Sequence, residues 1–263
     1  MGKIRAVFFD IDGTLVSFKT HRIPPSTLDA VAALRSRGIK VYIATGRPVP
    51  FIDNLGELEY DGMITVTGAH CFTSGGEVIY HQSVSAESVG CVVGHLTHGA
   101  DAYPVIFVCS DEMFITELNE DVDAVARLLD IKMPPVRPAS YACGKDVLQL
   151  ISFFKADREP HFMSALMPDC TSMRWHPFFT DVIAGGVDKS VGIDKVLAYE
   201  GLSLDEAMAF GDGGNDMAML SHVPCGIAMG NACEELKEVA AYVTASVDED
   251  GVARALRHFG LIN

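Results

Sequence analysis

Two aspartates, one residue apart, follow the first apolar run of the chain. The run 7–9 (Val-Phe-Phe) ends at Asp10, and Asp12, Gly13 and Thr14 come directly after it. Neighbouring residues of a strand point to opposite faces, so Asp10 and Asp12 converge only if the chain turns after Asp10. Two carboxylates held close together repel each other unless a cation or a shared proton lies between them. The pattern therefore predicts a divalent metal site where a buried strand ends.

Three further segments carry residue types that suit phosphoryl chemistry. They are 44–47 (Ala-Thr-Gly-Arg), Lys189 in the segment 187–190, and 211–216 (Gly-Asp-Gly-Gly-Asn-Asp). Taken singly, each has an ordinary structural explanation as a turn, a helix start, a surface charge or a flexible loop. Together, at the edge where open α/β sheets bind ligands, they supply a nucleophilic carboxylate, a hydroxyl, a cation and a second acidic metal anchor. Phosphoryl transfer needs these parts, because positioning and charge neutralisation do most of its catalysis.

The elements that must position these segments alternate between strand and helix at both ends of the chain. We expect strands at 4–10, 40–45, 63–66, 207–211 and 226–229, and helices at 26–37, 190–200, 216–221, 232–240 and 251–258. A further helix is expected to open at 46–48, and Ser26 and Gly38 are expected to cap the helix 26–37. This alternation predicts a parallel sheet with right-handed crossovers.

The middle of the chain has a different rhythm. Helices are expected at 86–98, 120–130 and 158–167, and strands at 105–109, 113–117, 147–154, 170–175 and 179–183. Several of these strands follow one another through short turns, which indicates a mainly antiparallel sheet. The predicted fold class is α/β, a Rossmann-like parallel-sheet core (1–82 and 186–263) with an inserted α+β cap domain (83–185).

Composition narrows the classes of partner and compartment. The chain of 263 residues has 35 acidic and 20 basic residues and a net charge of -15, which disfavours nucleic acid and anionic lipid as partners. No apolar run reaches the ~20 residues of a membrane span. The seven cysteines show no C-x-x-C spacing, and the first strand leaves no room for a signal peptide. We expect a cytoplasmic protein with reduced cysteines and no obligate protein partner.

The four motifs, read together, resemble those of the haloacid-dehalogenase superfamily of phosphotransferases. The resemblance is to its Cof-type phosphatases, which carry a large α/β cap between the second and third motifs, and within that group to a bacterial hexose-phosphate phosphatase. It extends from Phe8 to Gly251 and so covers nearly the whole chain. It implies a Mg²⁺-dependent phosphatase that acts on small phosphorylated metabolites, with hexose phosphates as the expected substrates.

The resemblance also implies roles for the acidic residues. Asp10 would attack phosphorus and form an aspartyl-phosphate, and Asp12 would protonate the leaving oxygen and then deprotonate the hydrolytic water. Asp10, the backbone carbonyl of Asp12, and Asp212 would hold Mg²⁺. Asp216 would be a nearby metal-site carboxylate that orients the other ligands.

Other residues would bind the phosphoryl group. The hydroxyl of Thr45, the backbone amide of Gly46 and the ammonium of Lys189 would hold its non-bridging oxygens, with Asn215 beside them. Arg47 would meet either the substrate or the cap.

The cap contains a short polar and aromatic segment around the only tryptophan of the chain. Trp175 and His176 can stack on a sugar and bind its hydroxyls, and Asp181 on the next strand can bind hydroxyls too. Alternatively, Trp175 seals the apolar core of the cap. In the core domain, Thr67 stands where relatives usually carry Asn, which bears on fine contacts in the site rather than on catalysis.

Three other functions remain open at this point. A phosphomutase on the same scaffold would return the phosphoryl group to the sugar instead of to water. A signalling receiver domain also uses clustered acids, a Thr and a Lys, but it has about half this length and its acceptor does not lie in the first strand. A catalytically silent sugar-phosphate binder is disfavoured because every expected catalytic position is filled.

Overall fold

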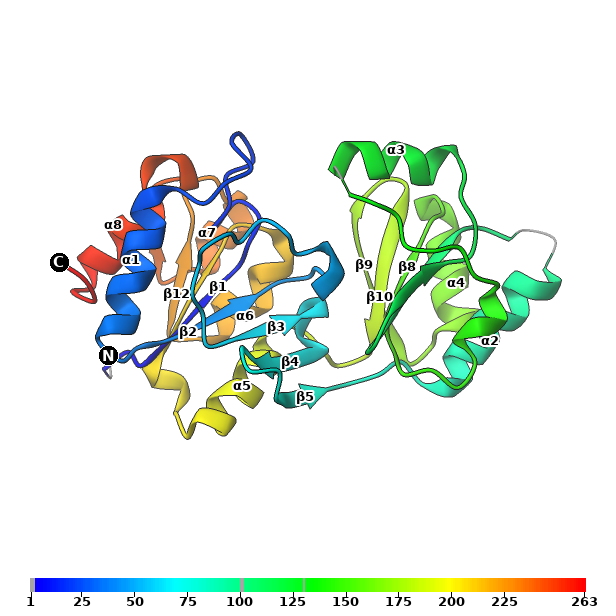
Figure 1. Cartoon of the computed structure of the whole chain (residues 1–263), viewed down its shortest axis with the longest axis horizontal. Coiled ribbons are helices and arrows are strands. Elements are labelled where there is room, and N and C mark those ends of the chain that lie inside the picture. Colours follow the sequence, from blue (N-terminus) through cyan, green and yellow to red (C-terminus); the bar gives the residue numbers. More distant parts are fainter. Residues whose placement is uncertain (1–2, 100–101, 130) are drawn as a thin grey trace. The chain divides into compact units, whose positions relative to one another are not determined.

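The computed structural model describes residues 3–99, 102–129 and 131–263, and the chain divides into two compact units. The first unit combines Met1–Tyr80 with Asp188–Asn263, and the second is His81–Val187 (Figure 1). The segment 83–185, expected as an insertion, lies within the second unit. Among the described residues, no helix is long and apolar enough to cross a membrane.

The first unit is built on an eight-stranded sheet that is mainly parallel. In spatial order its strands are β13 (Tyr242–Val243), β12 (Cys225–Ala228), β11 (Ala207–Gly211), β1 (Ala6–Phe9), β2 (Lys40–Ala44), β3 (Gly62–Thr65), β4 (His70–Thr73) and β5 (Val78–His81). β1 pairs in parallel with both β11 and β2, whereas β3 and β4 pair antiparallel. The predicted parallel sheet is confirmed.

Helices cover both faces of this sheet because its strands are apolar on both faces. Along β1, Val7 and Phe9 belong to one buried cluster and Phe8 to the other. The first cluster includes α1 (Pro25–Ser36) and α8 (Gly251–His258); the second includes α5 (Lys189–Glu200), α6 (Met217–His222) and α7 (Glu234–Val239). Each buried Phe contributes about 1.5–3 kcal/mol, so the two apolar layers hold the strand ends in place.

Two local predictions in this unit are wrong. No helix opens at 46–48, and only a 3₁₀ turn at Val49–Phe51 follows. Pro50 has no N–H to donate, and Pro48 disfavours helical geometry at the residue before it. Ser26 lies inside α1 rather than at its N-cap, which is Pro24, and its hydroxyl bonds to Asp250 instead. Gly38 does end this helix with a positive φ of 75°.

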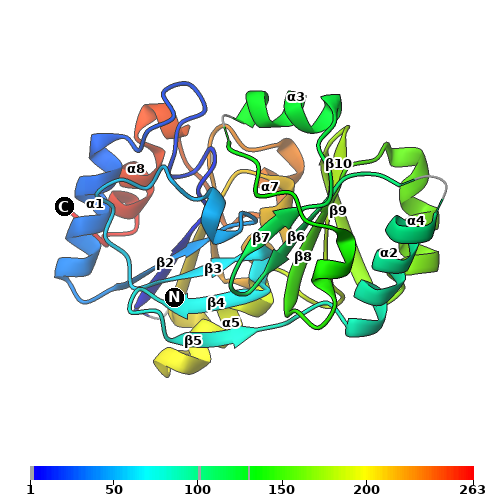
Figure 2. The same ribbon diagram turned by 45° about the vertical axis from the view of Figure 1, so that its right-hand side comes forward.

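The second unit is an antiparallel sheet with helices. Its strand order is β7 (Met113–Ile115), β6 (Val105–Cys109), β8 (Val147–Ser152), β10 (Phe179–Ala184) and β9 (Cys170–His176), visible in Figure 2. Helices α2 (Ala86–His98) and α4 (Glu159–Leu166) pack against one face, where Phe107 and Leu150 are buried. The third helix, α3, is Glu120–Leu129; position 130 of the predicted helix lies outside the described residues.

Candidate active site

The sequence motifs of the first unit meet at one edge of its sheet. Asp10 directly follows β1, Thr45 follows β2 and Asp212 follows β11. Because β1 pairs in parallel with both neighbours, the carboxyl ends of these three strands are adjacent. Asp10 and Thr45 are 6% and 1% exposed, so these polar side chains are held in a largely dry environment.

Lys189 joins two carboxylates from distant parts of the sequence. It is fully buried, and its Nζ lies 2.6 Å from Oδ1 of Asp10 and 2.6 Å from Oδ1 of Asp216. The other oxygen of Asp216 accepts hydrogen bonds from the backbone N–H groups of Asp212 and Gly213, both at 2.9 Å. Both oxygens of Asp216 are therefore engaged by the protein.

The position of Lys189 is set by the start of α5. Asp188 caps this helix, because its side chain accepts hydrogen bonds from the backbone N–H groups of Ser190 and Val191. The turn 66–68 packs directly on this start: a Cβ at Gly68 would lie 2.0 Å from the carbonyl oxygen of Asp188. Gly68 has a φ of 103°, which other residues rarely adopt.

The three carboxylates of this edge form a suitable set of metal ligands. One oxygen from each of Asp10, Asp212 and Asp216 lies within 4.8 Å of the others, and all three residues are buried. Hard oxygen donors at the end of a strand are the ligands that Mg²⁺ prefers. The donor set therefore fits a divalent cation.

Burial dominates the electrostatics of the site. It raises the pKa of Asp212 to about 7; the charge of Asp216 raises this pKa further, whereas the Thr14 hydroxyl and Lys189 lower it. Burial also raises the pKa of Asp10, and Lys189 offsets this only in part. Burial lowers the pKa of Lys189, but the charges of Asp10 and Asp216 outweigh it and raise this pKa above the ordinary range. One ammonium thus faces three carboxylates, so added positive charge would stabilise their ionised forms.

Asp12 is held by Arg47 in a two-pronged ion pair. Nε and one terminal nitrogen of Arg47 each lie 2.7 Å from a carboxylate oxygen of Asp12. The other terminal nitrogen donates to the carbonyl of Phe51 at 2.8 Å, and the backbone N–H of Arg47 donates to the hydroxyl of Thr45. This bidentate geometry fixes the orientation of the Asp12 carboxylate.

At Gly46, the segment 44–47 comes close to the segment 211–216. A Cβ at this position would lie 3.3 Å from Oγ1 of Thr67 and 3.4 Å from Nδ2 of Asn215, so these side chains stand beside the Gly46 backbone. Thr67 has a φ of 51° and a ψ of 34°, a left-handed conformation that Asn adopts more readily than a β-branched residue. Thr in place of Asn at position 67 therefore adds backbone strain and also changes the hydrogen bonds that the side chain can make.

Sequence reasoning missed Asn231. Its Nδ2 donates to the carbonyl of Gly13 at 2.9 Å and to Oδ2 of Asp212 at 3.1 Å, and its Oδ1 accepts from the backbone N–H of Val247. It ties the turn after Asp10 to a candidate metal ligand. A signal was available, because Asn231 follows β12 at the same edge of the sheet.

The three cap residues form one cluster within the second unit. Nε1 of Trp175 donates to Oδ2 of Asp181 at 2.9 Å, and the Trp175 ring meets Phe179 edge-on at 4.8 Å. The imidazole ring of His176 stacks on the ring of Phe179, and the two ring centroids lie 5.3 Å apart. Trp175 is 59% exposed, so the interpretation that it seals the cap core is wrong.

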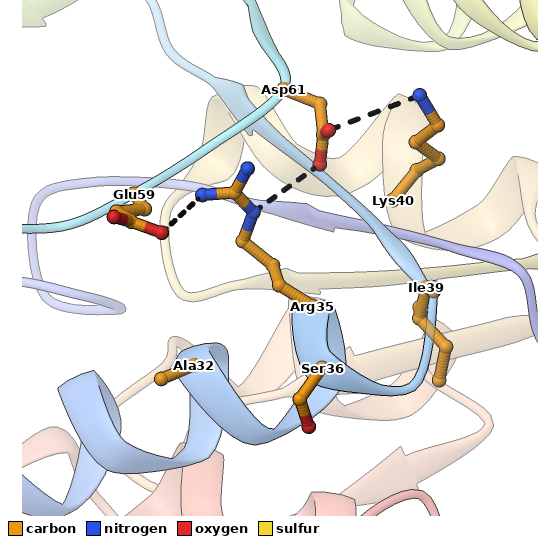
Figure 3. Close-up of a pocket in the computed structure, with 8 residues that line it drawn as sticks. Ala32, Arg35, Ser36, Ile39, Lys40, Glu59 and Asp61 are labelled. Atoms are coloured by element: carbon orange, nitrogen blue, oxygen red, sulfur yellow. Dashed lines mark hydrogen bonds and ion pairs between the residues drawn. The ribbon is translucent and has the colours of Figure 1, made fainter.

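A separate pocket of about 450 Å³ lies on the first unit beside α1 and the start of β2 (Figure 3). Figure 3 shows Arg35 between Glu59 and Asp61, with Lys40 also directed at Asp61. Its charged groups pair with one another. The pocket adjoins the amino end of β2, whereas Thr45 follows the carboxyl end, so it is not part of the carboxylate site.

Known proteins with the same arrangement identify the family. Residues 7–256 match the haloacid dehalogenase-like hydrolases, and the chain belongs to this family. The protein YkrA of Bacillus subtilis (strain 168) is 35% identical over 262 residues, 98% of each chain. The phosphatase YitU of the same organism, which acts on 5-amino-6-(5-phospho-D-ribitylamino)uracil, is 28% identical over 96% of each chain.

A solved structure agrees with the sequence relatives. The structure of the subclass IIB sugar phosphatase BT4131 is 43% identical to this chain and superposes with a TM-score of 0.88, covering 98% of this chain and 100% of the other. The protein is therefore a phosphoric monoester hydrolase of the haloacid-dehalogenase superfamily that acts on small phosphorylated substrates. Family membership excludes the receiver-domain alternative.

Proposed function

We propose that the protein is a Mg²⁺-dependent phosphatase that hydrolyses hexose phosphates through an aspartyl-phosphate on Asp10. The observation that carries this proposal is the buried contact of Lys189 with Asp10 and Asp216 beside Asp212. A nucleophilic carboxylate, a cation and a set of hard oxygen ligands thus occupy one strand edge. The finer assignments below build on that arrangement.

The metal site would use Asp10, the backbone carbonyl of Asp12, and Asp212. When bound, Mg²⁺ would neutralise charge on the phosphoryl oxygens. Asp216 would orient this set rather than ligate directly, because Lys189 and two backbone N–H groups already engage its oxygens.

Hydrolysis would proceed in two steps, formation of the aspartyl-phosphate and its breakdown by water. A carboxylate oxygen of Asp10 forms a bond to phosphorus as the bond to the leaving oxygen breaks, and Asp12 gives that oxygen a proton. Asp12 then takes a proton from water, whose oxygen attacks phosphorus and breaks the bond to Asp10. Arg47 would hold the Asp12 carboxylate in position between the steps, as it does in the structure.

The phosphoryl oxygens would be held by groups that flank Asp10. Lys189 supplies the charge, the Thr45 hydroxyl and the Gly46 backbone N–H supply hydrogen bonds, and Asn215 stands beside Gly46. Such fixed donors stabilise charge without reorganising during the reaction.

The second unit would act as the cap that selects the substrate, through Trp175, His176 and Asp181. BT4131 is named a sugar phosphatase, and the compound named for YitU carries a polyhydroxylated ribityl chain. Both substrates present hydroxyl groups beside a phosphate, which supports a sugar phosphate here. All seven cysteines are free thiols, which supports a reducing, cytoplasmic location.

Phosphate release from a panel of phosphorylated metabolites, with and without Mg²⁺, tests the proposal. Hexose phosphates should rank above phosphorylated compounds without a sugar, and a chelator should abolish turnover. Asp10→Asn should lose turnover by more than a thousandfold while it keeps the wild-type circular dichroism. Near-normal activity of that variant would refute the mechanism. With a hexose 1-phosphate, appearance of the 6-phosphate instead of free phosphate would show a phosphomutase.

A further inference from the structure

Both carboxylate oxygens of Asp212 accept a hydrogen bond from a neutral side chain. Oγ1 of Thr14 donates to Oδ1 at 2.9 Å, and Nδ2 of Asn231 donates to Oδ2 at 3.1 Å. The same amide nitrogen of Asn231 donates to the carbonyl of Gly13 at 2.9 Å. Donors on both oxygens hold the carboxylate in one orientation, and each oxygen keeps a further lone pair for a cation. Asp212 is therefore oriented before a metal binds.

Asn231 is in turn oriented by the protein backbone. Its Oδ1 accepts a hydrogen bond from the backbone N–H of Val247 at 2.9 Å. If the amide turned over, its NH₂ group would face this N–H and its oxygen would face the carboxylate of Asp212. Both contacts would then be unfavourable, because donors would meet donors and acceptors would meet acceptors. Asn231 therefore acts on Asp212 as a donor and not as a metal ligand.

The segment 244–251, which carries Val247, packs closely on the segment that carries Asn231. The backbone N–H of Gly230 donates to the carbonyl of Ala245 at 3.0 Å, and a Cβ at Gly230 would lie 2.6 Å from the backbone nitrogen of Ser246. The side chain of Val247 is buried in the apolar cluster under α1 and α8. Backbone packing and an apolar anchor thus fix the N–H that orients the amide.

We propose that Asn231 is a positioning residue of the metal site and that the N–H of Val247 sets the direction of its amide. The path from Val247 through Asn231 to Asp212 orients one ligand of a divalent cation in advance. A ligand that is already oriented loses little freedom on binding, so this path raises the affinity for the metal. The inference rests on the proposed function, because it needs Mg²⁺ at Asp212, and deepens it by adding the residues that control metal affinity.

Asn231→Ala tests the first step of this path, with Mg²⁺ alone as the probe. The dependence of the unfolding temperature on Mg²⁺ concentration gives Kd. We expect Kd to rise about tenfold or more, the usual effect of removing the partner of a metal ligand. At saturating Mg²⁺, phosphate release from para-nitrophenyl phosphate should return to within about threefold of the wild type, because excess metal compensates for a weaker site.

Thr244→Val is the matched control in the same segment. It removes a buried hydroxyl that donates to the carbonyl of Gly251 at 2.8 Å and keeps the size of the side chain. It should lower the free energy of unfolding but leave Kd for Mg²⁺ within about twofold of the wild type, because it leaves the contacts of Asn231 in place.

Val247→Pro tests the second step, because proline removes the N–H that Asn231 accepts. Val247 is the first residue of a 3₁₀ turn, and Ser246 before it is extended with a φ of -66° and a ψ of 164°, so proline fits this position. Val247→Ala keeps the N–H and removes more of the buried side chain. We expect Kd for Mg²⁺ to rise about fivefold or more in Val247→Pro and to stay within about twofold in Val247→Ala.

Each other outcome contradicts a stated step. A wild-type Kd in folded Asn231→Ala would overturn the inference, and so would an equal rise in Thr244→Val, which would indicate general loosening of the segment. Equal rises in Val247→Pro and Val247→Ala would assign the effect to apolar packing instead of the N–H. If Asn231→Ala does not fold, the two variants of Val247 decide, because both retain Asn231.

The inference and the proposed function fail in different ways. If Mg²⁺ does not change the unfolding temperature of the wild type, the proposed metal site is refuted. If Mg²⁺ stabilises the wild type and all variants with the same Kd, the metal site stands and only the positioning role of Asn231 is refuted.

Discussion

At the scale of residues, the site is a balance of buried charges. Lys189 contacts Asp10 and Asp216 at 2.6 Å each, and none of the three is more than 6% exposed. Taking such charges out of water is costly, and the mutual contacts offset this cost only while all partners are present. The lysine is therefore important to the stability of the metal-free protein.

Lys189→Met should destabilise the metal-free protein by about 3–5 kcal/mol, because two buried carboxylates lose their counter-charge. Urea unfolding in the presence of a chelator measures this. Lys195→Met on the exposed side of the same helix is the control and should cost less than about 1 kcal/mol. An equally small cost at Lys189 would mean that the carboxylates are protonated or solvated in the folded state.

Asp181 should make stability depend on pH. Burial raises its pKa to about 7 in the folded protein, although the hydrogen bond from Trp175 lowers it. A raised folded-state pKa favours the protonated form, so its contribution is fully present below about pH 4 and is lost as the pH rises through 7. Asp181→Asn should therefore stabilise the protein at pH 8 relative to pH 4.5 by about 1.4 kcal/mol or more, the value of one pKa unit.

Urea titrations of both proteins at the two pH values measure this difference. Asp121→Asn on α3, an exposed position, serves as the control and should show the same effect at both. A pH-independent effect of Asp181→Asn would place the pKa of Asp181 in its ordinary range.

At the scale of elements, short turns after the strands position the chemistry. The turn 66–68 follows β3 and packs on the first residues of α5, and only a glycine fits where Gly68 meets the carbonyl of Asp188. The helix start in turn carries Lys189 to its partners. Backbone contacts in one turn thus set the position of the Lys189 ammonium, which lies far away in sequence.

Gly68→Ala should push the start of α5 away from the sheet, because its Cβ would lie 2.0 Å from a backbone oxygen. We expect more than a tenfold loss of kcat and a loss of stability well above the about 1–2 kcal/mol of left-handed strain alone. Gly76→Ala is the matched control, since Gly76 has a φ of 85° and nothing within 4 Å of its added Cβ. Similar losses at both glycines would show that strain, not the clash, is responsible.

At the scale of the whole molecule, each of the two units has its own apolar core, and the carboxylate site lies in the first unit. The carboxylates and Lys189 belong to the first unit, whose sheet lies between two apolar clusters. The second unit has its own cluster around Phe107 and Leu150. Separate cores predict that the two units respond to different perturbations.

Differential scanning calorimetry with and without Mg²⁺ tests this separation. Mg²⁺ should raise the unfolding temperature of the first unit, because the proposed metal site exists only in the folded unit. Phe107→Ala leaves a cavity in the second unit and should reduce its free energy of unfolding by about 3–5 kcal/mol. The unfolding temperature of the second unit should fall accordingly. A single transition moved equally by both changes would show that the units unfold together.

Much of this protein follows from local patterns. Apolar runs and the residues that end them predicted the parallel sheet, the antiparallel second sheet, and Asp10, Thr45 and Asp212 at strand ends, because alternation and turn chemistry act over a few residues. Prolines at 48 and 50 overrode the helix expected there, and the short edge strand β13 left too weak a pattern to detect.

The tertiary structure alone decided which side chains meet. Lys189 reaches Asp10 across 179 positions, Arg47 pairs with Asp12, and Gln149 is buried with an unpaired oxygen, none of which a local pattern encodes. Such contacts depend on how apolar layers pack and on the direction of each side chain from its strand or helix. That packing is a property of the whole folded chain, so the sequence alone predicted the parts of the site and the fold determined their contacts.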